Sequence, residues 1–194
     1  PESLPAERRH DGGLRMLLDG TRELARDHVL VRLLFINALS FGLLMAYLSA
    51  APFVLRNVLG MGTVAYTAVF GLCGATVTVT IAVAASLVRR FSQARQVRVG
   101  LIAGLVVDTV FAGVCLMWLR EPVTGPERMP LLVAVVALFL AHVACLGLSM
   151  GNAPALALDR TGRWAGTGSA LLGFLQFVVG GLVSPLVGLT GEAS

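Results

Sequence analysis

Residues 147–191 read GLSMGNAPALALDRTGRWAGTGSALLGFLQFVVGGLVSPLVGLTG, and this stretch decides the fold class. Two apolar segments flank a short hinge that carries three charged residues, Asp159, Arg160 and Arg163. The first segment is interrupted by Gly151, Asn152 and Pro154, and we expect its helix to end there because proline lacks an N–H and clashes with the preceding turn. The second segment is long enough to cross a hydrocarbon core of about 30 Å. The stretch therefore predicts two membrane helices that meet at a basic loop.

Small residues recur along the second apolar segment at intervals of four. They are Ser169 and Gly173, followed by Gly180, Ser184 and Gly188. Small side chains on one helix face let a neighbouring backbone approach closely, which is how helices associate in lipid. Gln176 lies within the same segment, and a buried amide in hydrocarbon needs a hydrogen-bonding partner or a wet cavity. The segment is therefore expected to pack against other helices.

The composition of the whole chain agrees with a membrane protein. Of its 194 residues, 56% are apolar and 13% are charged, whereas about 25% are charged in soluble domains. We therefore predict an all-α membrane protein. The three cysteines, Cys73, Cys115 and Cys145, lie in apolar runs and are interpreted as packing thiols, so we expect no metal site.

Five apolar segments reach the length of about 18 residues or more that a membrane-spanning helix requires. They cover residues 33–53, 64–88, 99–119, 131–158 and 167–190. Short turns are expected between them, the first around Pro52, Gly60 and Gly62, the next two at residues 89–98 and 121–130. The sequence thus predicts a transmembrane bundle over residues 29–194.

Residues 1–28 are predicted to form a linker that precedes the bundle. Between residues 14 and 25, apolar side chains share one helical face and charged side chains share the other. This pattern fits an amphipathic helix on the membrane surface, and it also fits a solvated helical linker because the apolar face is narrow. The sequence leaves both interpretations open.

The arginines predict the orientation of the chain in the membrane. Twelve of them fall in the linker and in the second and fourth loops, whereas three fall on the opposite side. Under the positive-inside rule this bias places the N-terminus in the cytoplasm.

Several motifs resemble one branch of a known family. They are Asn152 to Leu158 with Ala165 to Gln176, the segment from Tyr47 to Leu55, the basic turn from Leu87 to Phe91, and the opening from Glu2 to Arg9. Together they resemble the Bcr/CflA, or bicyclomycin-resistance, type of the major facilitator superfamily. The chain departs from that pattern where Gly151 precedes Asn152 and Pro154 follows it, because the family usually has Pro-Asn.

The resemblance implies a function and a place in a larger protein. Members of the family have twelve helices in two halves, so the opening would be the central loop and the five spans would be helices seven to eleven. The first residue is Pro1, and we expect the chain to be the C-terminal part of a longer transporter. The resemblance implies proton-driven efflux of small amphipathic, drug-like compounds from a bacterial inner membrane by alternating access. The proton gradient would supply the energy without a cofactor, and the partners would be lipid, substrate and the N-terminal half, with no nucleic acid.

Polar residues inside the predicted spans are the candidate site residues. Asp108 and His142 are candidates for proton coupling, since an ionisable group at mid-membrane depth is costly and the charge of histidine changes near neutral pH. Hydrogen-bonded packing roles remain open for both. The candidate substrate-binding residues are Asn37, Ser40, Tyr47, His142, Asn152, Gln176 and Phe177. Tyr47 could also be an interfacial anchor.

Two other classes of function were weighed against transport. A membrane-embedded enzyme could use Asp108 and His142 with Cys145 or Cys115, but the spacing offers no pairing of a nucleophile with a base. A non-transporting membrane scaffold or an inactive fragment is the other alternative. We therefore expect a transporter and not an enzyme.

Overall fold

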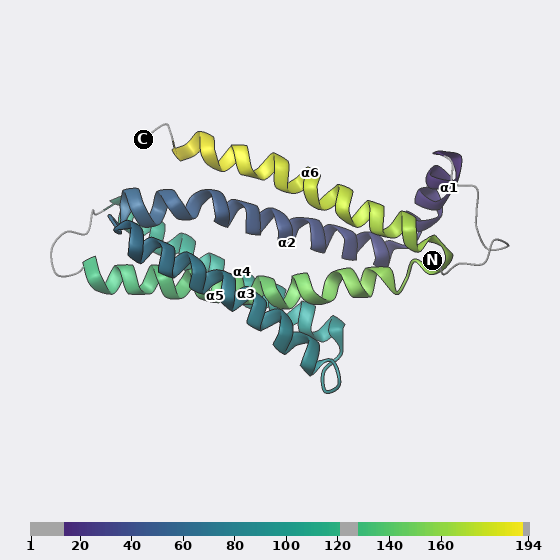
Figure 1. The fold of residues 1–194 in the computed structure, drawn as a ribbon, viewed down its shortest axis with the longest axis horizontal. Helices are drawn as coiled ribbons and strands as arrows, with labels where there is room; N and C mark the ends of the chain where they lie inside the picture. Colours follow the sequence, from purple (N-terminus) through teal and green to yellow (C-terminus); the bar gives the residue numbers. More distant parts are fainter. Residues whose placement is uncertain (1–13, 121–127, 192–194) are drawn as a thin grey trace.

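The computed structural model describes residues 14–120 and 128–191, and in this part of the chain all the secondary-structure elements are helices, joined by short turns (Figure 1). Its α-helices are α1 (Leu14–Leu24), α2 (His28–Pro52), α3 (Thr63–Leu87), α4 (Gln93–Arg120), α5 (Arg128–Leu158) and α6 (Ala165–Gly191). A π-helix, η2 (Phe53–Val58), extends α2, and a 3₁₀ turn, η4 (Gly162–Trp164), precedes α6. The predicted opening motif at residues 1–13 lies outside the described residues.

Five of these helices are long and apolar enough to cross a membrane, which confirms the all-α membrane fold and the five predicted spans. The three expected turns between the spans are shorter than the sequence predicts. The α2 helix includes Pro52 and continues as η2, α4 begins at Gln93, and α5 begins at Arg128. The α2 helix begins where it does because the Asp27 carboxylate accepts hydrogen bonds from the backbone N–H groups of Val29 and Leu30.

The predicted break in the helix at Gly151–Pro154 was wrong, because α5 contains Pro154 and continues without interruption to Leu158, which is the predicted end of the fourth span. Packing against neighbouring helices lets membrane helices tolerate proline, since these neighbours and local polar side chains compensate the altered backbone. Asn152, which was expected to help end the helix, donates from Nδ2 to the carbonyl oxygen of Leu148 at 2.9 Å. The hinge that follows starts at Asp159 and contains Gly162, whose φ of 50° suits glycine.

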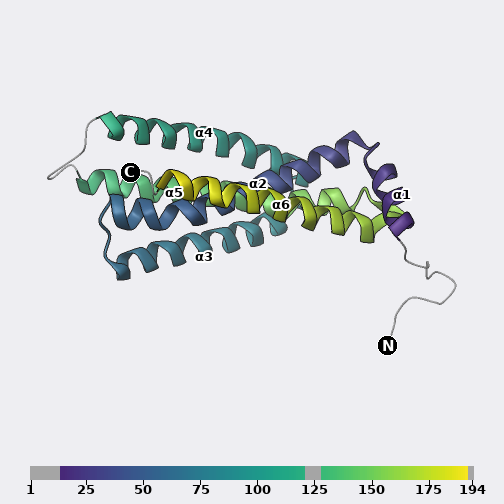
Figure 2. The ribbon, with the colours of Figure 1, turned by 90° about the horizontal axis from the view of Figure 1, so that it is seen from above.

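The bundle is built around α2 and α5, which pack against each other. Helix α6 packs along α2, while α3 and α4 both pack on α5 and lie on opposite sides of it (Figure 2). Gly42 and Gly180 allow the close contact between α2 and α6, because a Cβ at Gly180 would lie 2.8 Å from the ring of Phe41. The small-residue row predicted on the last span is thus used at Gly180, whereas Gly173 faces open space.

Two apolar clusters hold the ends of the bundle. The larger contains Tyr47, Ala51, Leu55, Leu59, Cys73, Val135, Phe139 and Val143. The smaller joins α1 to the bundle and contains Leu24, Leu30, Leu34, Ala157 and Leu172. Several polar residues of the predicted spans meet across helix pairs in this bundle.

Candidate functional site between helices α4 and α5

One row of side chains on α4 faces one row on α5, and we call this contact the α4–α5 seam. The α4 row is Gln96, Gly100, Gly104 and Asp108, and the α5 row is His142, Cys145, Ser149 and Asn152. Residues three or four apart share a helix face, so each row is continuous, and the two rows run antiparallel.

The centre of the seam is a close backbone approach. A Cβ at Gly100 would lie 2.9 Å from the backbone carbonyl oxygen of Cys145 and 2.9 Å from Oγ of Ser149. At Gly104 the nearest atom would be Cβ of Cys145 at 3.5 Å, which is an ordinary contact. The glycines therefore set the distance at which the polar residues on either side can meet.

Asp108 and His142 form the pair at the middle of both helices. Nδ1 of His142 lies 2.6 Å from Oδ1 of Asp108, and their side chains are 13% and 38% exposed, respectively. An ionisable group in a membrane interior is expensive unless it is paired or reaches a water-filled cavity. The structure therefore brings together the two residues that the sequence singled out as proton-coupling candidates, although it does not test that role.

Two adjoining hollows open onto this pair. A hollow of about 270 Å³ is lined by Leu43, Ala46, Tyr47, Ala50, Asp108, Phe111, Leu138, Phe139 and His142. A second, of about 200 Å³, also contacts Asp108 and His142 and reaches Ser40 and Ser149. The pair thus lies where an aromatic hollow meets a more polar one. Such a mixed lining can hold an apolar body and orient one polar group of a ligand.

Ser40 and Tyr47 are the candidate substrate-binding residues of α2 that line these hollows. Tyr47 is buried and its ring stacks on Phe70 and meets Phe139 edge-on, so it is not the interfacial anchor that the sequence also allowed. Its hydroxyl makes no hydrogen bond of good geometry among the described residues and has the Cys73 thiol as its polar neighbour.

The remaining candidate residues lie elsewhere in the bundle. Nδ2 of Asn37 donates to Oε1 of Gln176 at 3.3 Å across the α2–α6 contact, which supplies the partner that Gln176 was expected to need. Asn152 lies at one end of the α4–α5 seam, where its Nδ2 donates to Oε1 of Gln96 at 3.4 Å. Phe177 is 70% exposed and meets Phe41 edge-on. Among the residues that the structure describes, the seven predicted residues are therefore spread over several helix contacts, and their role in substrate binding stays a prediction.

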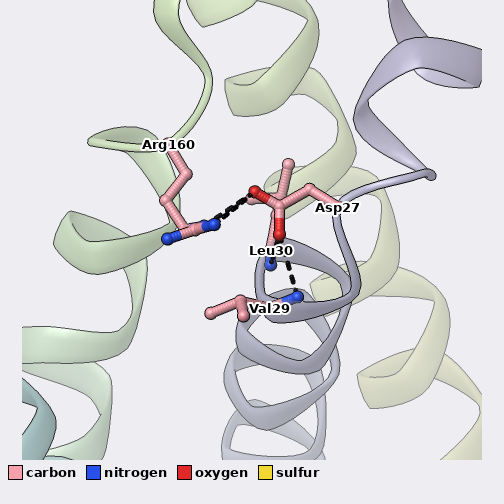
Figure 3. A network of polar contacts seen from close by, with 4 residues as sticks. All are labelled: Asp27, Val29, Leu30 and Arg160. Atoms are coloured by element: carbon pink, nitrogen blue, oxygen red, sulfur yellow. Dashed lines mark hydrogen bonds and ion pairs between the residues drawn. The ribbon is translucent and has the colours of Figure 1, made fainter.

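Ion pairs join α1 and the start of α2 to the hinge before α6. Arg160 donates to Asp27 at 2.7 Å while the same carboxylate caps α2, as Figure 3 shows. Arg163 donates to Glu23 at 2.7 Å. The guanidinium of Arg160 is the main cause that lowers the pKa of Asp27, and that of Arg163 does the same for Glu23.

Sequence reasoning missed Gln96 and the pair of Ser49 with Ser184. The two hydroxyl oxygens of that pair lie 2.8 Å apart across α2 and α6. Gln96 was assigned to a basic loop, yet it continues the four-residue row of Gly100, Gly104 and Asp108. This four-residue spacing could have placed Gln96 on the same helix face as Asp108.

Comparison with known proteins gave a family match and one distant relative. The sequence model of the Major Facilitator Superfamily matches residues 1–185. The chain is 24% identical over 192 residues to a protein of Bacillus subtilis (strain 168) described as the uncharacterized MFS-type transporter YdgK. The alignment covers 97% of this chain and 44% of that protein, so the chain spans less than half the length of this relative. No solved structure matches the chain.

Proposed function

Because this chain belongs to the major facilitator superfamily, we propose that it is part of a proton-coupled exporter of small amphipathic compounds. Family membership makes it a membrane transporter and not an enzyme, and its five apolar helices make it a multi-pass membrane protein. The proposal adds the energy source, the direction of transport and the substrate class. The motifs similar to the Bcr/CflA type support drug efflux and a bacterial inner membrane with the N-terminus in the cytoplasm.

The observation that carries the proposal is the hydrogen-bonded pair of Asp108 and His142. It lies at the middle of two membrane-spanning helices, and both side chains contact the hollows. A carboxylate and an imidazole in contact can together bind or release one proton, and this changes the net charge between α4 and α5. A change of charge at this depth alters the free energy of opening the seam to water. Proton binding there would consequently bias one conformation over another.

The aromatic hollow supports the substrate class. Tyr47, Phe111 and Phe139 offer apolar surfaces, while Asp108 offers one polar contact. A compound bound there would touch the same residues that hold the proton, so the proton and the compound would affect each other's binding. The chain spans 44% of its relative, and we propose that the rest of a longer protein supplies the other wall of an alternating-access cavity.

The test is transport by the full-length protein in proteoliposomes. We expect a pH gradient to drive movement of a fluorescent amphipathic substrate, accompanied by measurable proton movement in the opposite direction. Asp108→Asn should reduce gradient-driven transport by at least about tenfold, because the amide cannot exchange a proton in this range, while substrate-gradient-driven exchange should persist.

Ser184→Ala is the matched control, because it removes a polar contact of the α2–α6 pair without touching Asp108 or His142. It should keep both transport modes. Wild-type proton coupling in Asp108→Asn, with an unchanged pH profile, would refute the assignment of the proton to this pair.

A further inference from the structure

The corner between α1 and the start of α6 has features that the proposed transport cycle does not use. Gly20 and Leu24 of α1 are buried against the bundle. Leu14, Leu17 and Leu18 are instead 73%, 44% and 59% exposed. Leucines exposed at the end of a membrane bundle, on a helix with a charged opposite face, favour contact with lipid over a solvated linker.

Two adjoining hollows occupy this corner. The larger, about 520 Å³, is mainly apolar and is lined by Leu14, Met16, Leu17, Arg163, Trp164, Gly166 and Thr167. The smaller, about 380 Å³, is charged and is lined by Met16, Asp19, Glu23, Arg163 and Trp164. Met16, Arg163 and Trp164 border both. A ligand that filled the corner would therefore have an apolar part beside a charged part, as a phospholipid does.

The charges of the smaller hollow distinguish between headgroups. One nitrogen of Arg163 donates to Glu23 at 2.7 Å, and its guanidinium lies 5.0 Å from the Trp164 ring. A guanidinium has five N–H donors, so others can bind a phosphate. Asp19 is exposed and makes no ion pair among the residues of the described ranges. A headgroup with a phosphate alone would face two carboxylates, whereas one that also carries a primary ammonium matches them.

We propose that this corner binds an aminophospholipid, such as phosphatidylethanolamine, from the adjoining leaflet. Its phosphate contacts Arg163, its ammonium contacts Asp19 and Glu23, and its upper acyl chain follows Leu14 and Leu17. Phosphatidylcholine has no N–H to donate to a carboxylate, and phosphatidylglycerol has no cation. The proposal is independent of proton coupling, because none of these residues contacts Asp108 or His142.

The test uses Trp164 as a reporter in the full-length protein. The chain has two tryptophans, so Trp118→Phe leaves Trp164 as its remaining one, and tryptophans outside this chain are replaced as well. The protein is reconstituted in phosphatidylcholine vesicles that contain a small fraction of one lipid brominated near the top of its acyl chains. Quenching by brominated phosphatidylethanolamine should exceed quenching by the phosphatidylcholine or phosphatidylglycerol analogue about threefold, the factor expected for one exposed ion pair.

Asp19→Asn should reduce this preference to the level of phosphatidylcholine, because the ammonium loses its free carboxylate. Asp159→Asn is the matched control, since it removes the same charge from an exposed position that lines neither hollow, and it should keep the preference. Arg163→Gln should weaken quenching by all three lipids.

Equal quenching by the three lipids would show a nonspecific lipid boundary and would overturn the proposal. So would stronger quenching by phosphatidylglycerol, which would point to an anionic headgroup, or a preference that Asp19→Asn leaves intact. Circular dichroism of each variant confirms that its helices are retained.

Discussion

The contact between α2 and α6, which we call the α2–α6 seam, resembles the α4–α5 seam in arrangement but joins different chemical groups. Each has a glycine against which the facing helix packs closely, Gly180 in the first and Gly100 in the second. Each has two polar contacts between helices. In the α2–α6 seam all the groups are neutral, an amide pair and a hydroxyl pair. In the α4–α5 seam one contact is an amide pair and the other joins a carboxylate to an imidazole.

The two seams therefore differ in whether their polar contacts contain groups that can exchange a proton. Neutral amides and hydroxyls bind each other with the same strength across the physiological pH range. We therefore expect the strength of the α2–α6 seam to be independent of pH. The contact between Asp108 and His142 instead joins a carboxyl group to an imidazole, and side chains of these two types form the proton relays of many pumps and transporters. The α4–α5 seam is also lined by two hollows that reach Asp108 and His142. The following predictions test that distinction.

The largest difference is expected from adding one methyl group to each close approach. Gly100→Ala places Cβ against a backbone carbonyl that cannot rotate away, and such overpacking costs about 1–3 kcal/mol. Gly180→Ala meets the Phe41 ring and the Met45 side chain, which can adjust, so it should cost less. Reversible unfolding in mixed detergent micelles measures both, with Gly104→Ala as a near-neutral control. A larger loss at Gly180 would reverse the ranking.

A second prediction concerns the polar pairs at mid-membrane depth. Asp108→Ala should destabilise the protein by about 1–2 kcal/mol, because it leaves the His142 imidazole without its carboxylate partner. Gln176→Ala removes a neutral amide contact with Asn37 and should cost less, about 0.6 kcal/mol, the average for interhelical hydrogen bonds in membranes. Unfolding of each variant at pH 7 provides the measurement. Equal losses for the two variants would remove the distinction between the seams.

A smaller effect is expected at the hydroxyl pair between α2 and α6. Ser184→Ala leaves Ser49 without its partner, and interhelical hydrogen bonds in membranes contribute about 0.6 kcal/mol on average. Ser169→Ala, at an exposed position of the same helix, is the control and should have no measurable effect. The same unfolding assay applies. A cost at Ser184 well above that of Asp108→Ala would mean that neutral contacts dominate the bundle.

The smallest effect is expected at Asp27, whose ion pair with Arg160 ties α2 to the hinge between α5 and α6. Its pKa is lowered, so the folded state binds this proton less readily than the unfolded state does. The resulting stability is present above the ordinary pKa and is lost as the pH falls below about 4. Asp27→Asn should flatten that acid dependence while keeping the cap of α2.

Asp27→Ala provides the comparison, because it loses both the cap and the ion pair and should cost more than Asp27→Asn at pH 7. Unfolding between pH 3 and pH 7 separates the two contributions. Equal costs for the two variants at pH 7 would show that the cap adds nothing.

The sequence was sufficient to predict the spans, because membrane helices are specified by local hydropathy and length. The segment predicted at residues 64–88 appears as Thr63–Leu87, for example. The prediction of a helix break at Pro154 was wrong because the rule that proline ends a helix takes no account of packing against neighbouring helices. Helix α5 lies between α3 and α4. Local patterns thus described each helix well and its neighbours poorly.

The sequence singled out the polar residues of the spans one by one, but it could not predict which of them meet. Asp108 and His142 were both selected for their depth, yet their contact depends on how two helices are rotated about their axes. That rotation is set by Gly100 against Cys145, a contact between residues 45 positions apart in the sequence. Asn37 and Gln176 were likewise assigned to a cavity wall before the structure showed them bonded to each other.

The antiparallel pairing of Asp108 with His142 also bears on how the protein is made. A lone aspartate at the centre of a helix costs about 2.5–3.5 kcal/mol on translocon insertion scales. Its partner lies 34 residues later, in the next helix to leave the ribosome. We therefore expect nascent α4 to remain beside the translocon until α5 arrives, so that the two helices enter the bilayer as one hairpin. In a glycosylation-based insertion assay, α4 alone should insert less efficiently than its Asp108→Leu form, and appending α5 should remove that deficit.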